Sequence, residues 1–509
     1  MVKTYTHEFN TPLYKGSVTL KTGLFINGEW VDPVDGGDLI DVFDPASRCG
    51  TASGKVITTI PGGGQQDVDN AVKAAKKAFK TSWGLKVPGS QRGRILSKFA
   101  DLLENYADEL AALMSLDVGK PFSSTKEFEV STAVNVVRYF GGWADKVHGK
   151  TIETNDKKFA YTRHEPFGVV GEIIPWNSPL ISAVGKIAPA IATGNTVILK
   201  PSEITPLTTL FIADLFNDAG FPPGVLNLVN GYGHTVGSAL SLHPNVDKIS
   251  FTGSIITGRN ILKASAESNL KSVTLELGGK SPTIVFDDAV LDQAIKWAAH
   301  GIFYNMGQVC IAGSRIYVQE GIYDKFLEGF TAFTEELTSA TGQPFEAGTR
   351  HGPQVSKGQF DRVMGYISSG KSEGAKVQIG GESFGQEGYF IKPTVFVDVK
   401  PSMKIMQEEI FGPVCAVVKF KTEEEVTEWA NDTTFGLAAN ILTENSARAI
   451  RMANALEAGV IYVNNATAGD INVPFGGYKQ SGIGREMGEE ALHAYTQVKA
   501  VHLNIGQVL

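Results

Sequence analysis

Helical periodicity marks the first part of the chain. Apolar residues recur at intervals of three and four over 66–81 and over 92–114, so each segment is predicted to form one amphipathic helix. From about 165 to 285 the pattern changes to short β-rich runs, each followed by a helical segment. These runs are VVGEII (169–174), NTVILK (195–200), GVLNLV (224–229), DKISFT (247–252) and KSVTLE (271–276). The alternation predicts right-handed βαβ units and a parallel, Rossmann-like sheet that binds ligands at the carboxyl ends of its strands.

The same alternation continues less regularly after about residue 285 and predicts a second α/β domain. Helices are expected at 321–339, 355–369, 422–431 and 445–457, and strands near 315–318, 393–399, 413–420 and 458–464. Two further stretches, 150–165 and 495–504, alternate polar and apolar residues outside either predicted core. We expect them to be edge strands that pair with another subunit.

Composition narrows the class of protein. The 509 residues include 46 Lys and Arg against 54 Asp and Glu, a net charge of −8 that argues against nucleic acid as the main partner. Glu172 and Lys186 divide the richest apolar region, 167–199, into stretches of 13 residues, too short for the ~18 of a membrane helix. The first residues lack the apolar core of a secretory signal, and three cysteines (Cys49, Cys310 and Cys415) suit a reducing compartment. A cytoplasmic enzyme without a membrane partner is therefore expected.

Two glycine-rich loops are candidates for binding a phosphate group. The strict G-x-G-x-x-G motif is absent, and in 231–237 the third glycine comes one residue late. In FTGSIITG, Gly253 and Ser254 follow a predicted strand and open a helix, where backbone N–H groups favour an anion. Each loop is equally consistent with a plain turn. Two such corners in one sheet favour a dinucleotide cofactor without requiring it.

A P-loop pattern, G-x-x-x-x-G-K-S, occurs at 365–372. A functional P-loop needs a buried strand before it and a helix after it. Here helical spacing precedes the motif and a short strand, 375–380, follows it. The order is reversed, so we interpret the motif as a helix that ends at Gly370 as its C-cap. This argues against a P-loop NTPase.

Three polar residues are candidates for catalysis. Cys310 stands in GQVCIAGSR, Glu276 ends an apolar run before two glycines, and Asn177 follows the first predicted parallel strand. Each also has an ordinary interpretation: an inert buried thiol, a solvated turn acid, and an amide that bonds the backbone. No HExxH, CxxC or Cys/His cluster occurs, so no metal is expected.

Seven sequence runs resolve these alternatives. They are PWNSPL, KPSEITP, FTGSIITG, TLELGGKSP, GQVCIAGSR, EEIFGPV and PFGGYKQSG. In order and spacing they resemble the NAD(P)-dependent aldehyde dehydrogenase family, in its hydrolytic, non-phosphorylating branch with a broad substrate range. The resemblance covers about residues 20–505, and the 34 residues from Glu276 to Cys310 are a specific part of it.

The resemblance implies a role for each catalytic candidate. Cys310 is the nucleophile that forms a thiohemiacetal and then a thioester. Asn177 and the backbone N–H of Cys310 form the oxyanion hole, and Glu276 is the general base that activates water. A carboxylate at 276 favours hydrolysis over transfer to coenzyme A. An acyl-CoA-forming or semialdehyde-specific dehydrogenase is the alternative, and an idle crystallin-like relative is disfavoured because all three residues are present.

The resemblance also implies the cofactor site. The matching residues are Ile174, Pro175, Trp176, Lys200, Ser202, Glu203, Gly233, Gly237, Gly253, Ser254, Glu409 and Phe411. A carboxylate at Glu203 accepts bonds from ribose hydroxyls and repels a 2′-phosphate, so NAD is favoured. Lys200 and Ser202 leave NADP open as an alternative.

Small residues mark the predicted substrate tunnel. Ser178, Gly185 and the segment 466–470 stand where relatives tuned to acetaldehyde carry large aromatic residues, and Val309 and Ile311 flank the nucleophile. We therefore predict tolerance of medium or bulky aldehydes, aromatic or long-chain.

Three units are expected from the same comparison. These are a cofactor-binding domain (1–145 and 166–275), a catalytic domain (276–485) and an oligomerisation arm (146–165 with 486–509). A homotetramer is expected, with a dimer as the alternative.

Overall fold

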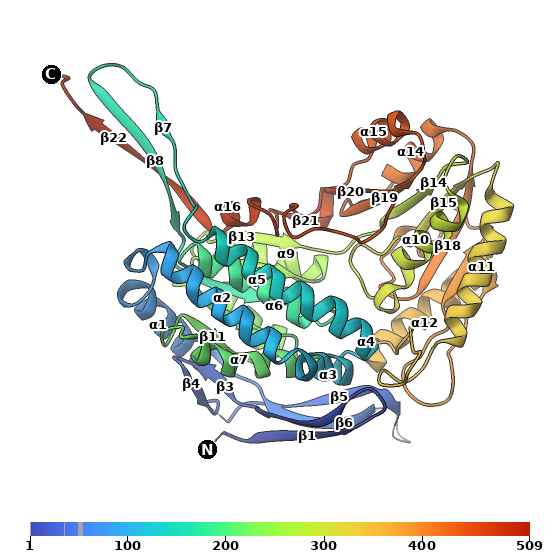
Figure 1. The fold of residues 1–509 in the computed structure, drawn as a ribbon, viewed down its shortest axis with the longest axis horizontal. Helices are drawn as coiled ribbons and strands as arrows, with labels where there is room; N and C mark the ends of the chain where they lie inside the picture. The colour runs from blue at the N-terminus through green and yellow to red at the C-terminus, as the bar shows by residue number, and fades with distance from the viewer. Residues whose placement is uncertain (1, 35, 49–53) are drawn as a thin grey trace.

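Two large sheets, one in each half of the molecule, carry most of the chain, and a narrow arm projects away from them (Figure 1). The computed structural model describes residues 2–34, 36–48 and 54–509. Cys49 lies outside the described residues. The predicted α/β class is confirmed, since both large sheets are mainly parallel and alternate with helices along the chain. Among the described residues, no helix combines the length and hydrophobicity that a membrane span requires.

The five strands predicted between 165 and 285 form the centre of an eight-stranded sheet. Its order is β21 (Gly482–Ile483), β13 (Ser272–Glu276), β12 (Lys248–Thr252), β9 (Val169–Ile173), β10 (Thr196–Lys200), β11 (Leu226–Leu228), β3 (Leu24–Ile26) and β4 (Glu29–Val31). The five central strands are parallel and follow the Rossmann order. From β9 the sheet grows through β10 and β11 on one side and through β12 and β13 on the other, so the switch point lies between β9 and β12. In sheets of this order, ligands bind in the crevice outside the carboxyl ends of the strands, at this switch point.

Helices cover both faces of this sheet, which explains why β9, β10 and β11 are buried along their whole length. Val170 packs on one side with α2 (Gly89–Asn105), α5 (Ser131–Trp143), α6 (Pro179–Ala192) and α7 (Leu207–Ala219). Val169 packs on the other side with α1 (Gln65–Thr81) and α9 (Ile255–Glu267). Successive side chains of a strand point to opposite faces, so both neighbours are buried.

The prediction of a single helix over 92–114 was wrong. Two helices, α2 and α3 (Ala107–Asp117), meet at Tyr106, whose φ of −105° and ψ of 29° are not helical. The Tyr106 ring packs edge-on against Phe211 of α7, with centroids 5.4 Å apart. Beyond this break α3 is buried on nearly all sides. The apolar spacing happens to continue across the junction, which conceals the change of direction.

The second large sheet has seven strands. Their order is β16 (Lys376–Ile379), β17 (Thr394–Val397), β18 (Val414–Phe420), β15 (Arg315–Gln319), β14 (Pro282–Val285), β19 (Ala438–Leu442) and β20 (Val460–Val463). The helices around it are α10 (Leu291–Phe303), α11 (Tyr323–Ser339), α12 (Lys357–Ser372), α14 (Glu423–Asn431) and α15 (Ser446–Ala455). Neither β14 nor β19 was among the predicted strands. Both are short and completely buried, so they show no alternation of polar and apolar residues.

The P-loop pattern at 365–372 is helical, which agrees with its rejection. The predicted C-cap at Gly370 was wrong, because α12 continues to Ser372 and the left-handed residue is Gly374, with φ +96°. Gly370 instead lies inside the helix against the second sheet. A Cβ atom there would come within 3.0 Å of the Phe396 ring, so the glycine permits close packing.

The stretches predicted as extended form one projecting sheet. It consists of β7 (Thr151–Ile152), β8 (Lys158–Pro166) and β22 (Thr496–Asn504), and β22 runs antiparallel to β8 along its whole length. Val498 on this arm is 63% exposed. The division into three units remains a prediction. The sheets do not follow this division at one strand: β21 lies in the range predicted as the catalytic domain, but it pairs with β13 of the first sheet.

The remaining strands form two antiparallel pairs at the N-terminal side of the molecule. They are β1 (Thr4–Asn10) with β2 (Lys15–Lys21), and β5 (Leu39–Arg48) with β6 (Gly54–Pro61). No strand was predicted in this region, where polar and exposed residues interrupt the apolar pattern.

Candidate active site

The three predicted catalytic residues come from three separate segments that meet between the sheets. Glu276 is the last residue of β13, Asn177 follows β9, and Cys310 lies in the loop between α10 and β15. The Cys310 thiol lies next to the Glu276 carboxyl, close enough for each group to change the pKa of the other. Nδ2 of Asn177 donates to the backbone oxygen of Gln308, two residues before the cysteine, at 2.9 Å. The structure therefore brings all three to one point.

Two glycines let the segments approach so closely. A Cβ atom on Gly279 would lie 2.4 Å from the backbone oxygen of Cys310, and one on Gly278 would lie 2.3 Å from Oε2 of Glu409. The Gly279 N–H donates to Oε1 of Glu409 at 3.0 Å. The pair of glycines after Glu276 is thus required by the backbone and carboxylate packed against them.

Replacing Gly279 with alanine is expected to lower kcat/KM by about 100-fold or more. The added methyl group should displace the Cys310 backbone, and moving a nucleophile by about 1 Å lowers the rate by a factor of this size. Overpacking is also expected to destabilise the fold by about 1–3 kcal/mol. Aldehyde turnover and urea unfolding measure the two effects. Gly365→Ala is the control, since its Cβ meets no atom within 4 Å on the surface of α12. Wild-type activity in the Gly279 variant would contradict the packing argument.

The backbone before the nucleophile is held in an unusual conformation. Asn305, Met306 and Gly307 all have positive φ, of 48°, 56° and 69°. Nδ2 of Asn305 donates to the backbone oxygens of Asn177 at 3.2 Å and Gln308 at 3.1 Å. Consecutive left-handed residues are rare and cluster at functional sites. Asn305 is a positioning residue that the sequence interpretation missed, although asparagine is the side chain that best tolerates this conformation.

Burial dominates the electrostatics of the nucleophile and base. It raises the pKa of Glu276, which is 4% exposed, to about 8, and Glu486 adds to the rise while Lys186 opposes it. Burial, followed by the adjacent Glu276 charge, raises the pKa of the Cys310 thiol well above its usual range. At neutral pH the pair is therefore mainly a protonated thiol and a protonated carboxylic acid.

A polar cluster lies behind Glu276. Lys186 of α6 is completely buried and forms an ion pair with Glu486. The same lysine donates to Ser250 Oγ of β12 at 3.3 Å. Lys186 and Glu486 both act on the Glu276 charge, so its pKa depends on residues 90 and 210 positions away in the sequence.

The predicted cofactor residues follow the switch point of the first sheet. Ile174, Pro175 and Trp176 come directly after β9, and the Ile174 N–H donates to the Lys200 oxygen at 3.2 Å. Gly253 and Ser254 follow β12, and Ser254 caps α9 by accepting from the Thr257 N–H at 3.3 Å. Backbone N–H groups at this helix start suit a diphosphate.

Further predicted cofactor residues surround the end of β10. Nζ of Lys200 donates to Glu203 at 3.4 Å, and Ser202 Oγ accepts from the Ile204 N–H at 3.3 Å. A Cβ atom on Gly237 would meet only Lys200, at 3.9 Å, and one on Gly233 would meet nothing within 4 Å. The glycines leave open space beside a lysine and a carboxylate, which fits an adenosine group.

The second sheet closes the crevice through Glu409 and Phe411. The Phe411 ring packs edge-on against Trp176, with centroids 5.2 Å apart, and its backbone φ is +59°. Burial raises the pKa of Glu409 to about 7. These two predicted residues therefore face the first sheet from across the crevice, near the glycine pair that follows Glu276.

A cavity of about 800 Å³ opens beside the nucleophile. Three predicted substrate residues, Ser178, Val309 and Ile311, line it, together with Thr467 and Ala468. The fourth, Gly185, does not line it. Gly185 is buried in α6, where the Met487 methyl group lies 3.2 Å from the position of a Cβ atom. Met487 thus fills the space that a small residue at 185 was expected to leave.

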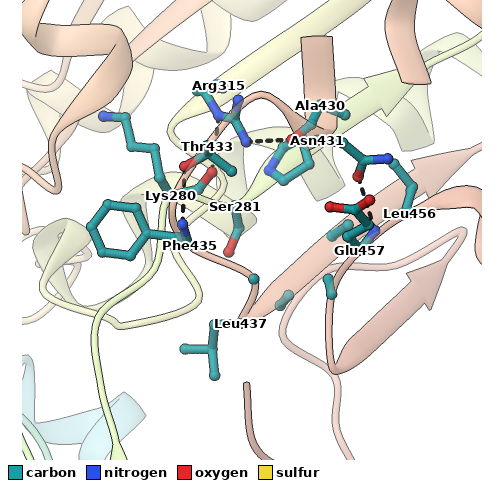
Figure 2. Close-up of a pocket in the computed structure, with 15 residues that line it drawn as sticks. Lys280, Ser281, Arg315, Ala430, Asn431, Thr433, Phe435, Leu437, Leu456 and Glu457 are labelled. Atoms are coloured by element: carbon teal, nitrogen blue, oxygen red, sulfur yellow. Dashed lines mark hydrogen bonds between the residues drawn. The ribbon is translucent and has the colours of Figure 1, made fainter. Parts of the chain in front are cut away.

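A second cavity, of about 10 Å³, lies behind the glycine pair and has room for one water molecule at most (Figure 2). Buried Arg315 lies at its wall and donates to the backbone oxygens of Lys280 and Ala430, both at 2.9 Å. This arrangement fastens the chain after Glu276 to the end of α14. In the described residues no group of three or more His, Cys, Asp or Glu side chains is arranged to hold a metal ion.

Known proteins resemble this chain over nearly its whole length. A family model described as the aldehyde dehydrogenase family matches residues 30–501. An aldehyde dehydrogenase of Agaricus bisporus is 55% identical over 505 residues, 99% of each chain. Aldehyde dehydrogenase 1A1 of Gallus gallus is 48% identical over 488 residues, 96% of this chain and 94% of the relative. The solved NAD+ complex of aldehyde dehydrogenase from Bacillus cereus has a TM-score of 0.92 at 45% identity, covering 95% of this chain and 97% of that one. This chain belongs to the aldehyde dehydrogenase family.

Proposed function

We propose that this protein oxidises aldehydes to carboxylic acids, with NAD as the electron acceptor and water as the final acyl acceptor. The observation that carries the proposal is the contact between the Cys310 thiol and the Glu276 carboxyl, beside Asn177. A nucleophile next to a base, with a third group holding the loop, is the arrangement that covalent catalysis requires.

Each proton has an acceptor. In the molecules whose Glu276 is ionised, Cys310 Sγ bonds to the aldehyde carbon as the thiol proton passes to Glu276, and the aldehyde oxygen gains the negative charge. Nδ2 of Asn177 donates one N–H to the Gln308 backbone oxygen. Its second N–H can stabilise the aldehyde oxygen together with the Cys310 N–H. When bound, NAD supplies the acceptor for the hydrogen and electron pair of the aldehyde C–H bond. After the oxidation, Glu276 releases the thiol proton to solvent. It then takes a proton from the water that attacks the resulting thioester and returns this proton to the leaving thiolate, which releases the acid and restores the thiol.

The residues around Lys200 support NAD over NADP. The Glu203 carboxylate is 30% exposed and bonded to Lys200, so a carboxylate already partners the nearest cation. A 2′-phosphate would have to displace that carboxylate and be repelled by it. The NAD+ complex of the Bacillus cereus relative agrees with this choice.

NADH absorbance over a panel of aldehydes tests the proposal. We expect NADH and free acid in equal amounts, with no change in rate when coenzyme A is added. Formation of an acyl-CoA would identify the transferase alternative. Failure to reduce NAD with any aldehyde would contradict the proposal.

We further infer a homotetramer, with a dimer as the alternative. The arm supports self-association, because β22 presents an outer strand edge and an exposed Val498 that an equivalent sheet of a second copy can cover. Light scattering of the purified protein distinguishes a tetramer, a dimer and a monomer.

The cavity supports the predicted tolerance of bulky aldehydes, and Ser178 is the residue to test. Its Oγ donates to Glu129 at 3.0 Å and accepts from Lys120 at 3.1 Å, so the side chain is held at the wall. Ser178→Phe is expected to lower kcat/KM for octanal relative to acetaldehyde by about 10-fold, a usual effect of lost pocket volume. Ser178→Ala is the control and should keep the wild-type ratio. Equal ratios in all three proteins would show that position 178 does not set the tunnel width.

A further inference from the structure

One wall of the large cavity consists of aromatic rings on a single helix face. Trp297 and His300 belong to α10, and Tyr304 follows its last turn. Their spacing of three and four residues places them one above another along the helix. The ring centroids of Trp297 and His300 are 5.8 Å apart, and those of His300 and Tyr304 are 5.2 Å apart.

A fourth ring joins this wall from a different segment. Phe128, in the helical turn Thr125–Val130, packs edge-on against Tyr304 with centroids 5.7 Å apart and remains 47% exposed at the cavity. Exposed aromatic surface inside a cavity is unfavourable unless a ligand covers it. Rings bind other rings in offset or edge-on arrangements and gain more than saturated groups of equal area.

The cationic groups of the cavity wall have carboxylate partners: Lys296 pairs with Asp292 and Arg350 with Glu336, both at exposed positions. Buried Lys120 and Glu129 form an ion pair, and Ser178 bonds to both. The pair has no net charge to offer a charged substituent. His300 is exposed, and desolvation by the surrounding groups lowers its pKa, so its ring is neutral at pH 7 and acts as an aromatic surface. The wall next to the nucleophile therefore suits a neutral ring.

We propose that the preferred substrates are aldehydes that carry a neutral aromatic ring, and that His300 and Tyr304 determine this preference over saturated aldehydes of equal size. The inference rests on the proposed aldehyde oxidation. It goes beyond it by choosing aromatic over long-chain aldehydes and by assigning that choice to particular residues.

Phenylacetaldehyde and cyclohexylacetaldehyde are the probes. They have the same number of heavy atoms, and a methylene group separates the aldehyde from the ring in both, so their intrinsic reactivities are similar. We expect the wild-type enzyme to favour phenylacetaldehyde in kcat/KM by about 5-fold to 10-fold, mainly through KM, as one or two ring contacts provide. A ratio of one or below would overturn the inference. If acetaldehyde is oxidised and neither ring aldehyde is, the inference also fails while the proposed function stands, and if no aldehyde is oxidised, the proposed function itself fails.

The double variant His300→Leu with Tyr304→Leu tests the assignment. Leucine keeps an apolar wall and removes the rings, so the phenyl-to-cyclohexyl ratio should fall to about one, with Tyr304→Leu alone giving an intermediate value. The ratio within one protein cancels general losses of active enzyme. Tyr106→Leu, at the α2–α3 junction outside the cavity, is the control and should keep the wild-type ratio. An unchanged ratio in the double variant would overturn the role of these residues.

Discussion

Replacing Cys310 with alanine is expected to lower kcat/KM for every aldehyde by at least about 10⁴-fold, because the covalent route has no other nucleophile in this site. Without the sulfur, the aldehyde carbon forms no tetrahedral adduct from which a hydride can leave. NADH formation under initial-rate conditions measures the loss. The fold and the NAD affinity should remain, since the side chain removed is small and lies beyond the predicted cofactor residues.

A matched control comes from the other described cysteine. Cys415 is buried in β18 within the core of the second sheet, and its thiol donates to the backbone oxygen of Thr394 at 3.8 Å. Cys415→Ala should therefore cost some stability and keep turnover. Thermal unfolding with and without NAD shows whether each variant is folded and binds the dinucleotide. Substantial turnover by a folded Cys310→Ala enzyme would mean that the reaction starts from another group.

The first sheet was predictable because its strands carry two independent signals. Runs such as 195–200 are rich in apolar and β-branched residues, and helical segments follow them at regular intervals, as parallel strands covered on both faces require. β14 and β19 are also followed by helices, but their sequences are weaker strand signals, since β14 begins with a proline and β19 with two alanines. The helix break at Tyr106 was not predicted from the sequence for another reason. Nothing in the local sequence there resembles a stop signal, and the break depends on packing against Phe211.

The catalytic candidates were identified by motif and not by periodicity. Cys310, Glu276 and Asn177 each had an ordinary interpretation until the order of the seven runs was considered. Their geometry needed the structure, because the Gly279 contact with the Cys310 oxygen joins segments 31 residues apart in the sequence. Gly185 shows the converse. A small residue indicates space, but Met487, distant in sequence, occupies it.

Replacing Glu276 with glutamine is expected to stop the reaction after the first oxidation. The amide keeps the size of the side chain but takes a proton neither from the Cys310 thiol nor from water. Thioester formation should therefore be slower than in the wild type, and the thioester should then accumulate on Cys310 because its hydrolysis has no base. We expect a burst of about one NADH per active site and then a steady rate about 10²-fold to 10⁴-fold below wild type, the usual contribution of a general base. Stopped-flow absorbance measures the burst, and mass spectrometry detects the acyl group. Asp361→Asn, in an exposed ion pair with Lys357, is the matched control and should show no change.

The pH dependence of hydrolysis should follow the same carboxyl. Burial raises the pKa of Glu276 to about 8, so the group is mainly protonated at pH 7 and becomes a base as the pH rises. The steady-state rate should therefore increase from pH 6 to pH 9 with a midpoint near 8, and the increase should disappear in Glu276→Gln. The sign for stability is opposite, because the folded state binds this proton more tightly than the unfolded state and loses that advantage as pH rises from about 4.5 to 8. A rate that is flat over this range in the wild type, or a glutamine variant that hydrolyses the thioester at the wild-type rate, would remove Glu276 from the hydrolytic step and leave it only the thiol proton of Cys310.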